Sequence, residues 1–148
     1  MAIPKSTSQP SLRVARTLDF PRERVWRAWT EAEALKRWMA PADDFRTEVP
    51  EYDCRVGGRY VIVMIAPDGT AHRIAGRFVE VKAPERLAYT WVWESGTTRE
   101  ETLVTIELSD REGKTDLVLT HQRFANEDTR DSHNKGWAGC LDRLARLA

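Results

Sequence analysis

The hydrophobic positions of this chain repeat at two different periods, and the change of period divides the sequence into segments. In residues 133–147 the apolar residues recur at spacings of three and four, which predicts a helix with one apolar face. This face consists of Trp137, Cys140, Leu141, Leu144 and Leu147. A helix of this kind that follows a run of strands is expected to lie across a sheet. The space between a curved sheet and one long helix is a common small-molecule site.

Strand-like alternation, with a period of two, marks residues 12–18 and most of the chain from residue 45 onward. The predicted strands cover residues 12–18, 45–53, 59–66, 71–81, 87–94, 102–108 and 116–123. Turn-forming sequences separate most of them, so neighbouring strands are expected to pair antiparallel. These turns are Gly57–Gly58, Pro67–Gly69, Ala83–Glu85, Ser95–Gly96 and Asp110–Gly113.

Two short helices are predicted between the first and second strands. The first follows Asp19, where Asp19 or one of its neighbours is expected to cap the helix, and it buries an apolar stripe that includes Trp29. The second begins at Thr30, because residues 30–33 resemble a capping box, and it ends at Pro41. The order of strand, two helices, six strands and a long helix predicts an α+β fold.

Composition narrows the class of protein. The 148 residues fit one domain over residues 12–148, preceded by a flexible N-terminus over residues 1–11. Lys plus Arg equal Asp plus Glu at 23 each, so no basic field exists to attract nucleic acid or an anionic membrane. No apolar run approaches the ~20 residues of a membrane span, and the start of the chain lacks a signal pattern. We therefore predict a cytoplasmic protein with no nucleic-acid partner and no membrane insertion.

Catalytic and metal-binding motifs are absent from the sequence. It has no glycine-rich phosphate loop, no Gly-x-Ser-x-Gly elbow and no His-Glu-x-x-His pair. His72, His121 and His133 come from separate segments without zinc-ligand spacing, so neither a metal nor a cofactor is predicted. Cys54 and Cys140 are too few for a disulfide framework, and neither has an identifiable base beside it. No catalytic residue is assigned, and whether the protein is an enzyme stays open, with a non-catalytic role favoured.

Several segments together resemble the START-like (SRPBCC) helix-grip superfamily, in the branch similar to the activator of Hsp90 ATPase. The resemblance spans residues 12–147. Its segments are Phe20–Trp29, Leu35–Trp38, Arg55–Tyr60 with Pro67–Gly69, Pro84–Trp91, Thr115–His121, and Gly136–Trp137 with Leu141–Leu144. The resemblance implies a curved antiparallel sheet wrapped around the long C-terminal helix. It also implies a cavity between them, which in relatives holds lipids, hormones, polyketides or other apolar molecules.

Strand parity predicts which side chains line such a cavity. On strand 87–94 the bulky residues share one parity, which we place inward. His121 follows the inward parity of its own strand, and His133 lies one helical turn before Trp137. Each histidine is either a satisfied structural group or one that orients a ligand or moves a proton. The ligand-binding candidates are Trp38, Met64, Phe78, Tyr89, Trp91, His121, His133 and Trp137, with ordinary core packing as the alternative for most of them.

Arg16 shares the parity of Val14 and Leu18, which predicts a partly buried guanidinium paired with an inner carboxylate or an anionic ligand head.

Three functions remain open at this point. The first is binding of a small hydrophobic ligand, as a carrier or sensor. The second is a polyketide cyclase-like or dehydratase-like enzyme that uses polar groups of the cavity. The third is an Hsp90 co-chaperone-like interaction, implied only by the resemblance. The expected partner is a small hydrophobic molecule, while a homodimer and a chaperone contact stay open.

Overall fold

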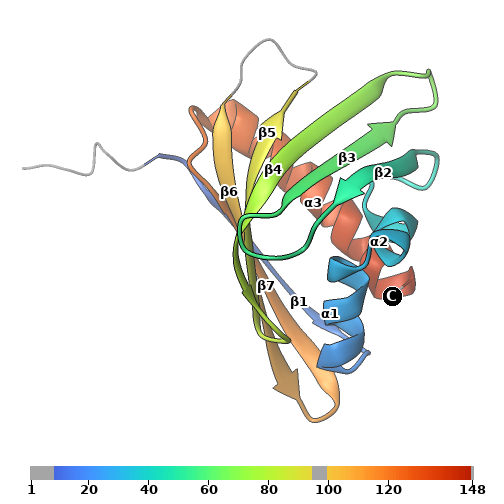
Figure 1. The fold of residues 1–148 in the computed structure, drawn as a ribbon, viewed down its shortest axis with the longest axis vertical. Coiled ribbons are helices and arrows are strands. Elements are labelled where there is room, and N and C mark those ends of the chain that lie inside the picture. The colour runs from blue at the N-terminus through green and yellow to red at the C-terminus, as the bar shows by residue number, and fades with distance from the viewer. Residues whose placement is uncertain (1–8, 95–99, 148) are drawn as a thin grey trace, which may run out of the picture.

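The computed structural model describes residues 9–94 and 100–147 of the chain, except for the side chain of Leu147. Seven strands form one antiparallel sheet in the order β1-β7-β6-β5-β4-β3-β2. The sheet curves around the long helix α3, and α1 and α2 lie beside the C-terminal half of that helix (Figure 1). The predicted α+β helix-grip architecture is confirmed. The elements are β1 (Leu12–Leu18), α1 (Arg22–Thr30), α2 (Ala32–Trp38), β2 (Arg46–Tyr52), β3 (Arg59–Ile65), β4 (Ala71–Lys82), β5 (Arg86–Trp93), β6 (Glu101–Arg111), β7 (Lys114–Gln122) and α3 (Glu127–Leu147).

Strand pairing follows the predicted hairpins, and β1 closes the sheet by pairing with β7. The hairpin between β6 and β7 is tighter than predicted. Asp110 and Arg111 belong to β6, and the turn contains only Glu112 and Gly113. Both turn residues have positive φ, at 51° and 88°, as a two-residue hairpin with the twist of its strands requires. The predicted turn at Ser95–Gly96 and most of the predicted flexible segment 1–11 lie outside the described residues.

The two predicted helix caps are wrong. Thr30 is the last residue of α1, and its hydroxyl donates to the Trp26 carbonyl at 2.8 Å, so it does not start α2. The N-cap of α2 is Glu31, which makes no side-chain capping bond. Asp19 does not cap α1 either, because its carboxylate lies 3.3 Å from the Lys114 ammonium and the N-cap position is Pro21. In both cases a competing polar partner takes the side chain.

Helix α3 begins at Glu127, six residues before the predicted start. Asn126 caps it, since its side-chain oxygen accepts a hydrogen bond from the Thr129 N–H at 2.8 Å. The predicted apolar face of α3 packs against the sheet: Trp137, Cys140, Leu141 and Leu144 are buried, whereas the side chain of Leu147 is outside the described part.

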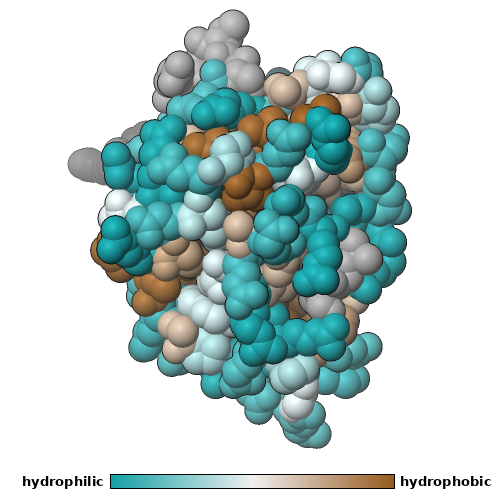
Figure 2. Space-filling model, turned by 45° about the vertical axis from the view of Figure 1, so that its right-hand side comes forward, coloured by the Kyte–Doolittle hydropathy of each residue, from teal (hydrophilic) through white to brown (hydrophobic). Residues whose placement is uncertain are grey.

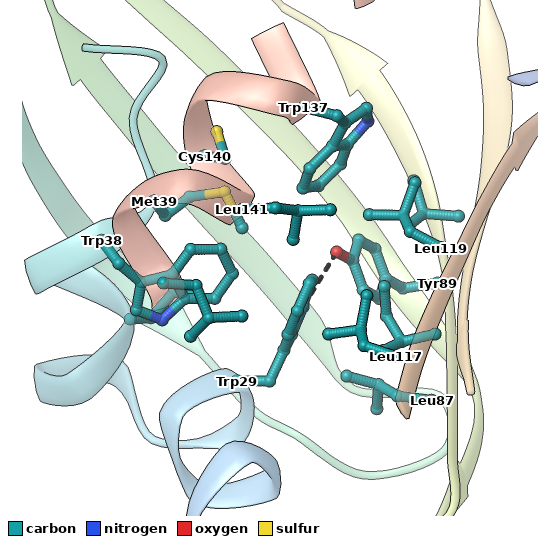
Figure 3. Close-up of a cluster of buried hydrophobic side chains, with 14 of the residues drawn as sticks. Trp29, Trp38, Met39, Leu87, Tyr89, Leu117, Leu119, Trp137, Cys140 and Leu141 are labelled. Carbon is teal, nitrogen blue, oxygen red and sulfur yellow. Dashed lines mark hydrogen bonds between the residues drawn. The ribbon is translucent and has the colours of Figure 1, made fainter. Parts of the chain in front are cut away.

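The core fills the concave side of the sheet, as strand parity predicted. Tyr60, Ile62 and Met64 of β3 are buried there, as are Leu87, Tyr89 and Trp91 of β5 and Leu117, Leu119 and His121 of β7. Figure 3 shows part of this core, with Trp29 of α1 and Leu141 of α3 both directed toward β5 residue Tyr89.

The outer surface is mostly polar. Figure 2 shows one face on which polar residues predominate and apolar side chains gather mainly in the upper half. On the convex side of the sheet, Glu94 lies 3.0 Å from Arg73 and 3.8 Å from Arg59. Within the described ranges, no helix is both long and apolar enough to cross a membrane.

Candidate functional site

A pocket of about 230 Å³ opens between α3 and the ends of β3, β4 and β5. It is larger than the ~150 Å³ apolar cavity that holds benzene and smaller than the ~300–1,000 Å³ of typical drug-sized sites. Its wall is mainly aromatic and sulfur-containing. The lining residues are Met39, Pro41, Phe45, Met64, His72, Trp91, Trp93, Ser132, His133, Gly136, Trp137 and Cys140.

Three parts of the chain build this wall, each for a local reason. Helix α3 contributes Ser132, His133, Gly136, Trp137 and Cys140, which share one face because they are three or four residues apart. The strands contribute alternate residues of their concave face, and the segment after α2 closes the third side. A Cβ placed on Gly136 would meet no heavy atom within 4 Å, so this glycine leaves open space at the wall.

Beneath the pocket, His121 is the centre of a buried chain of hydrogen bonds. The Trp137 indole N–H donates to His121 Nδ1 at 3.0 Å, and His121 Nε2 lies 2.7 Å from the Thr102 hydroxyl. That hydroxyl donates to the Trp91 carbonyl at 3.2 Å, so His121 Nε2–H must donate to Thr102. Burial lowers the pKa of His121 to about 2, with the nearby His133 adding to the effect. His121 is therefore a neutral Nε2–H imidazole with both nitrogens bonded.

His133 forms a second, similar unit at the pocket wall. Its Nδ1 lies 2.8 Å from the Thr129 carbonyl, and its Nε2 accepts the Trp93 indole N–H at 2.7 Å. His133 is thus the Nδ1–H tautomer, opposite to that of His121. Burial lowers its pKa, while the Thr129 carbonyl and Glu100 act in the opposite direction. Neither histidine has a free ring nitrogen to serve as a base in this state.

One polar atom at the pocket has no partner among the described residues. Trp91 is 4% exposed, and its indole nitrogen is buried without a hydrogen-bond acceptor. A buried donor of this kind is unusual in folded proteins and calls for an explanation.

The structure divides the eight ligand-binding candidates into two groups. Met64, Trp91, His133 and Trp137 line the pocket. Trp38 packs against Trp29 with ring centroids 4.5 Å apart and donates its indole N–H to the Ala28 carbonyl. His121 lies behind Trp91 and Trp137 in the network described above.

The remaining two candidates, Phe78 and Tyr89, belong to an aromatic cluster in the middle of the sheet. Their ring centroids are 5.7 Å apart, and each also packs against Tyr60. The Tyr89 hydroxyl accepts the Trp29 indole N–H at 3.2 Å, the bond drawn in Figure 3. The void among these rings is too small for a water molecule. The groove is therefore filled by side chains in this half and open only in the other.

Several lining residues were missed by the sequence reasoning. Met39, Pro41 and Phe45 lie between the end of α2 and the start of β2, although Phe45 falls at the start of the predicted strand 45–53, and none of them was proposed as a ligand contact. The helical spacing could have identified Ser132 and Gly136. Gly136 is three residues from His133 and four from Cys140, and Ser132 is four residues from Gly136, so they share one face of the helix. Trp93 had been placed inward by strand parity, and it does line the pocket.

Other predicted chemistry lies away from the pocket or is inactive. Arg16 is half-buried but pairs at 3.7 Å with Asp142, an exposed carboxylate on α3, and not with an inner carboxylate. Burial raises the pKa of the Cys140 thiol to about 12 and that of Cys54 to about 11, so both are protonated at neutral pH. Across residues 9–94 and 100–147, no three His, Cys, Asp or Glu side chains gather in a way that could hold a metal ion.

The comparisons with known proteins agree with this architecture. The family model described as "Activator of Hsp90 ATPase homolog 1-like protein" matches residues 19–148. The crystal structure of a protein from Chromobacterium violaceum has a TM-score of 0.86 and 31% identity, over 93% of this chain and 95% of that chain. A protein from Nitrosomonas europaea has a TM-score of 0.76 and 27% identity, over 93% of this chain and 92% of that chain. The AHSA1 protein from Silicibacter pomeroyi has a TM-score of 0.82 and 22% identity, over 93% of this chain and 96% of that chain. None of the curated proteins matches.

Proposed function

The chain belongs to the activator of Hsp90 ATPase homolog 1-like family, and we propose that it binds a small hydrophobic molecule in the pocket between α3 and the sheet. The observation that carries this proposal is the open, mainly apolar pocket of about 230 Å³, lined by Trp91, Trp93 and Trp137. Concave apolar sites with a few polar groups are the usual form of small-molecule sites.

Two polar groups at the pocket, His133 and Cys140, favour binding over catalysis. A general base needs a free lone pair within reach of its substrate. His133 Nε2, the ring nitrogen that would serve, already accepts the Trp93 N–H, and the Cys140 thiol is protonated. A cyclase-like or dehydratase-like activity would require His133 to release Trp93 first. Contact with an Hsp90-type chaperone is supported only by the family name, and no feature of the pocket supports it.

Gly136 provides a direct test of the proposed site. Because a Cβ at this position meets open space, Gly136→Leu should fill part of the pocket without displacing backbone. We expect indane and naphthalene to quench or shift tryptophan emission in the natural protein, since three tryptophans line the pocket. Gly136→Leu should weaken this binding at least tenfold, and Gly136→Ala should weaken it much less. Binding that is equally tight in Gly136→Leu would place the ligand elsewhere, and no binding by either compound would count against the proposal.

A further inference from the structure

We infer that the occupant of the pocket is a compact, uncharged molecule of one or two rings that presents a hydrogen-bond acceptor to the indole N–H of Trp91. This inference rests on the proposed binding function and specifies the chemical class of the ligand. Three features of the described residues carry it: an unused donor, a wall without Asp, Glu, Lys or Arg, and a closed end of the groove.

The unused donor is the Trp91 indole N–H. The four other tryptophans buried at the concave side or lining the pocket all have a partner for this group: Trp29, Trp38, Trp93 and Trp137 donate to Tyr89, Ala28, His133 and His121. Trp91 alone among these five has none within the described part of the chain, although it lines the pocket. A buried donor without an acceptor costs free energy, which a ligand acceptor would recover.

Among the described residues, the two imidazoles that pack against Trp91 have no acceptor left to offer it. The imidazoles of His121 and His133 lie with centroids 5.4 and 6.4 Å from the Trp91 ring. His121 Nδ1 already accepts from Trp137, and His133 Nε2 already accepts from Trp93. Their other nitrogens carry protons. In the proposed complex, a molecule in the pocket, which Trp91 lines, supplies the missing acceptor.

The wall also indicates that the ligand is uncharged. Its twelve lining residues include no Asp, Glu, Lys or Arg. The hydrogen bonds of His133 hold it in a neutral tautomer, so it supplies no cation for an anionic ligand. A charged group entering this wall would lose its hydration without gaining an Asp, Glu, Lys or Arg side chain as an ion-pair partner, which is unfavourable.

The volume of the open half of the groove favours a short ligand over a long chain. The open volume of about 230 Å³ exceeds the ~150 Å³ that holds benzene by roughly half. Beyond it, the groove is closed by the packed rings of Tyr60, Phe78 and Tyr89. A chain too long for the open half would have to displace this cluster to extend further along the groove, whereas a compact bicyclic molecule would not.

Two ligands of nearly equal shape test the role of Trp91. Indane is a bicyclic hydrocarbon, and 1-indanone adds one carbonyl acceptor. Their affinities are measured by calorimetry or tryptophan emission for the natural protein, Trp91→Phe and Trp93→Phe, with melting temperatures recorded to show that each variant folds. Trp93→Phe is the matched control, because the Trp93 N–H is already bonded to His133. We expect the affinity ratio of 1-indanone to indane to fall about tenfold in Trp91→Phe and to stay unchanged in Trp93→Phe.

The outcomes separate this inference from the proposed function. Suppose that Gly136→Leu abolishes binding of indane, but the affinity ratio of 1-indanone to indane is the same in the natural protein, Trp91→Phe and Trp93→Phe. This result would overturn the proposed hydrogen bond to Trp91 and would leave the proposed binding site standing. An equal fall of the ratio in Trp91→Phe and Trp93→Phe would also overturn it. Tight binding of 1-dodecanol would overturn the size limit. If neither bicyclic compound binds the natural protein, both this inference and the proposed function fail.

Discussion

At the scale of single residues, the most consequential group is His121, because a titratable side chain lies completely buried beneath the pocket. Its two ring nitrogens are both bonded, so the folded protein holds it neutral. The alternation of side chains along its strand correctly predicted that His121 points to the concave side of the sheet. Its partners could not be predicted, because Thr102 and Trp137 come from distant segments whose approach depends on the whole sheet.

Burial of His121 makes stability depend on pH. Its pKa falls from 6.5 to about 2 on folding, so below pH 6.5 the unfolded chain takes up a proton that the folded protein excludes. The free energy of unfolding should therefore decrease as the pH falls from 6.5 toward 2, by up to about 1.4 kcal/mol per pH unit. The pKa of His133 is also lowered by burial, so it acts in the same direction.

Urea unfolding at pH 7, 6 and 5 measures this effect, with His121→Gln as the comparison. The variant should be less stable at pH 7, because its buried partners lose their fitted imidazole, but its stability should change less between pH 7 and 5. Identical pH dependence in both proteins would show that His121 does not carry the effect.

Tyr89 supports a second prediction for a single atom. Removing its hydroxyl by Tyr89→Phe leaves the buried Trp29 indole N–H without an acceptor, which should cost about 1–3 kcal/mol of stability in urea unfolding. Since Tyr89 does not line the pocket, the affinity for 1-indanone should stay within a factor of two. A large loss of affinity with little loss of stability would place Tyr89 in the binding site.

At the scale of elements, α3 shows what periodicity can and cannot predict. Its apolar face from Trp137 to Leu144 was recognised because four side chains pack on the sheet. Its first six residues were missed because they carry no apolar stripe, and only the cap at Asn126 marks where the helix begins. The caps proposed for α1 and α2 failed for the opposite reason: the motif was present, but its side chains found other partners.

Two glycines on α3 should respond oppositely to alanine. A Cβ on Gly139 would lie 2.2 Å from the Pro41 carbonyl oxygen, so Gly139→Ala must push the helix away from that segment and should cost about 1–3 kcal/mol. A Cβ on Gly136 meets nothing, so Gly136→Ala should stabilise the helix by about 0.5–1 kcal/mol. Denaturant unfolding of both variants measures the difference. Equal effects at the two positions would contradict the close approach at Gly139.

At the scale of the whole molecule, the groove between sheet and helix is divided into a packed half and an open half. The sequence predicted the groove and most of its inward side chains, but not this division. Whether aromatic rings fill a space depends on their volumes and rotamers together, which no local pattern encodes. The segment after α2 completes the open half, and it is held by contacts with residues of α3 that are one hundred or more residues away in sequence.

Arg143 makes those contacts. Its guanidinium donates to the Arg37 and Trp38 carbonyls at 2.8 and 3.3 Å, at the end of α2, and also pairs with Asp43. Its side chain is 12% exposed, whereas that of Arg146, which also pairs with Asp43, is 55% exposed. Arg143→Met should cost about 2–3 kcal/mol and weaken ligand binding, because the carbonyls at the end of α2 lose their donor.

Arg146→Met is the matched control and should cost distinctly less, since an exposed ion pair contributes little. Thermal unfolding and 1-indanone affinity of both variants test the pair. If Arg143→Met loses stability but keeps full affinity, the pocket wall does not depend on this link.

The hydrogen-bond chain from Trp137 through His121 and Thr102 to the Trp91 carbonyl also has an evolutionary consequence. Each of its three hydrogen bonds matches one donor to one acceptor, so replacing the side chain of Trp137, His121 or Thr102 leaves a buried group unpaired. A lineage cannot exchange these positions one at a time without passing through a less stable protein. Homologous proteins should therefore keep Thr102, His121 and Trp137 together or have lost all three together.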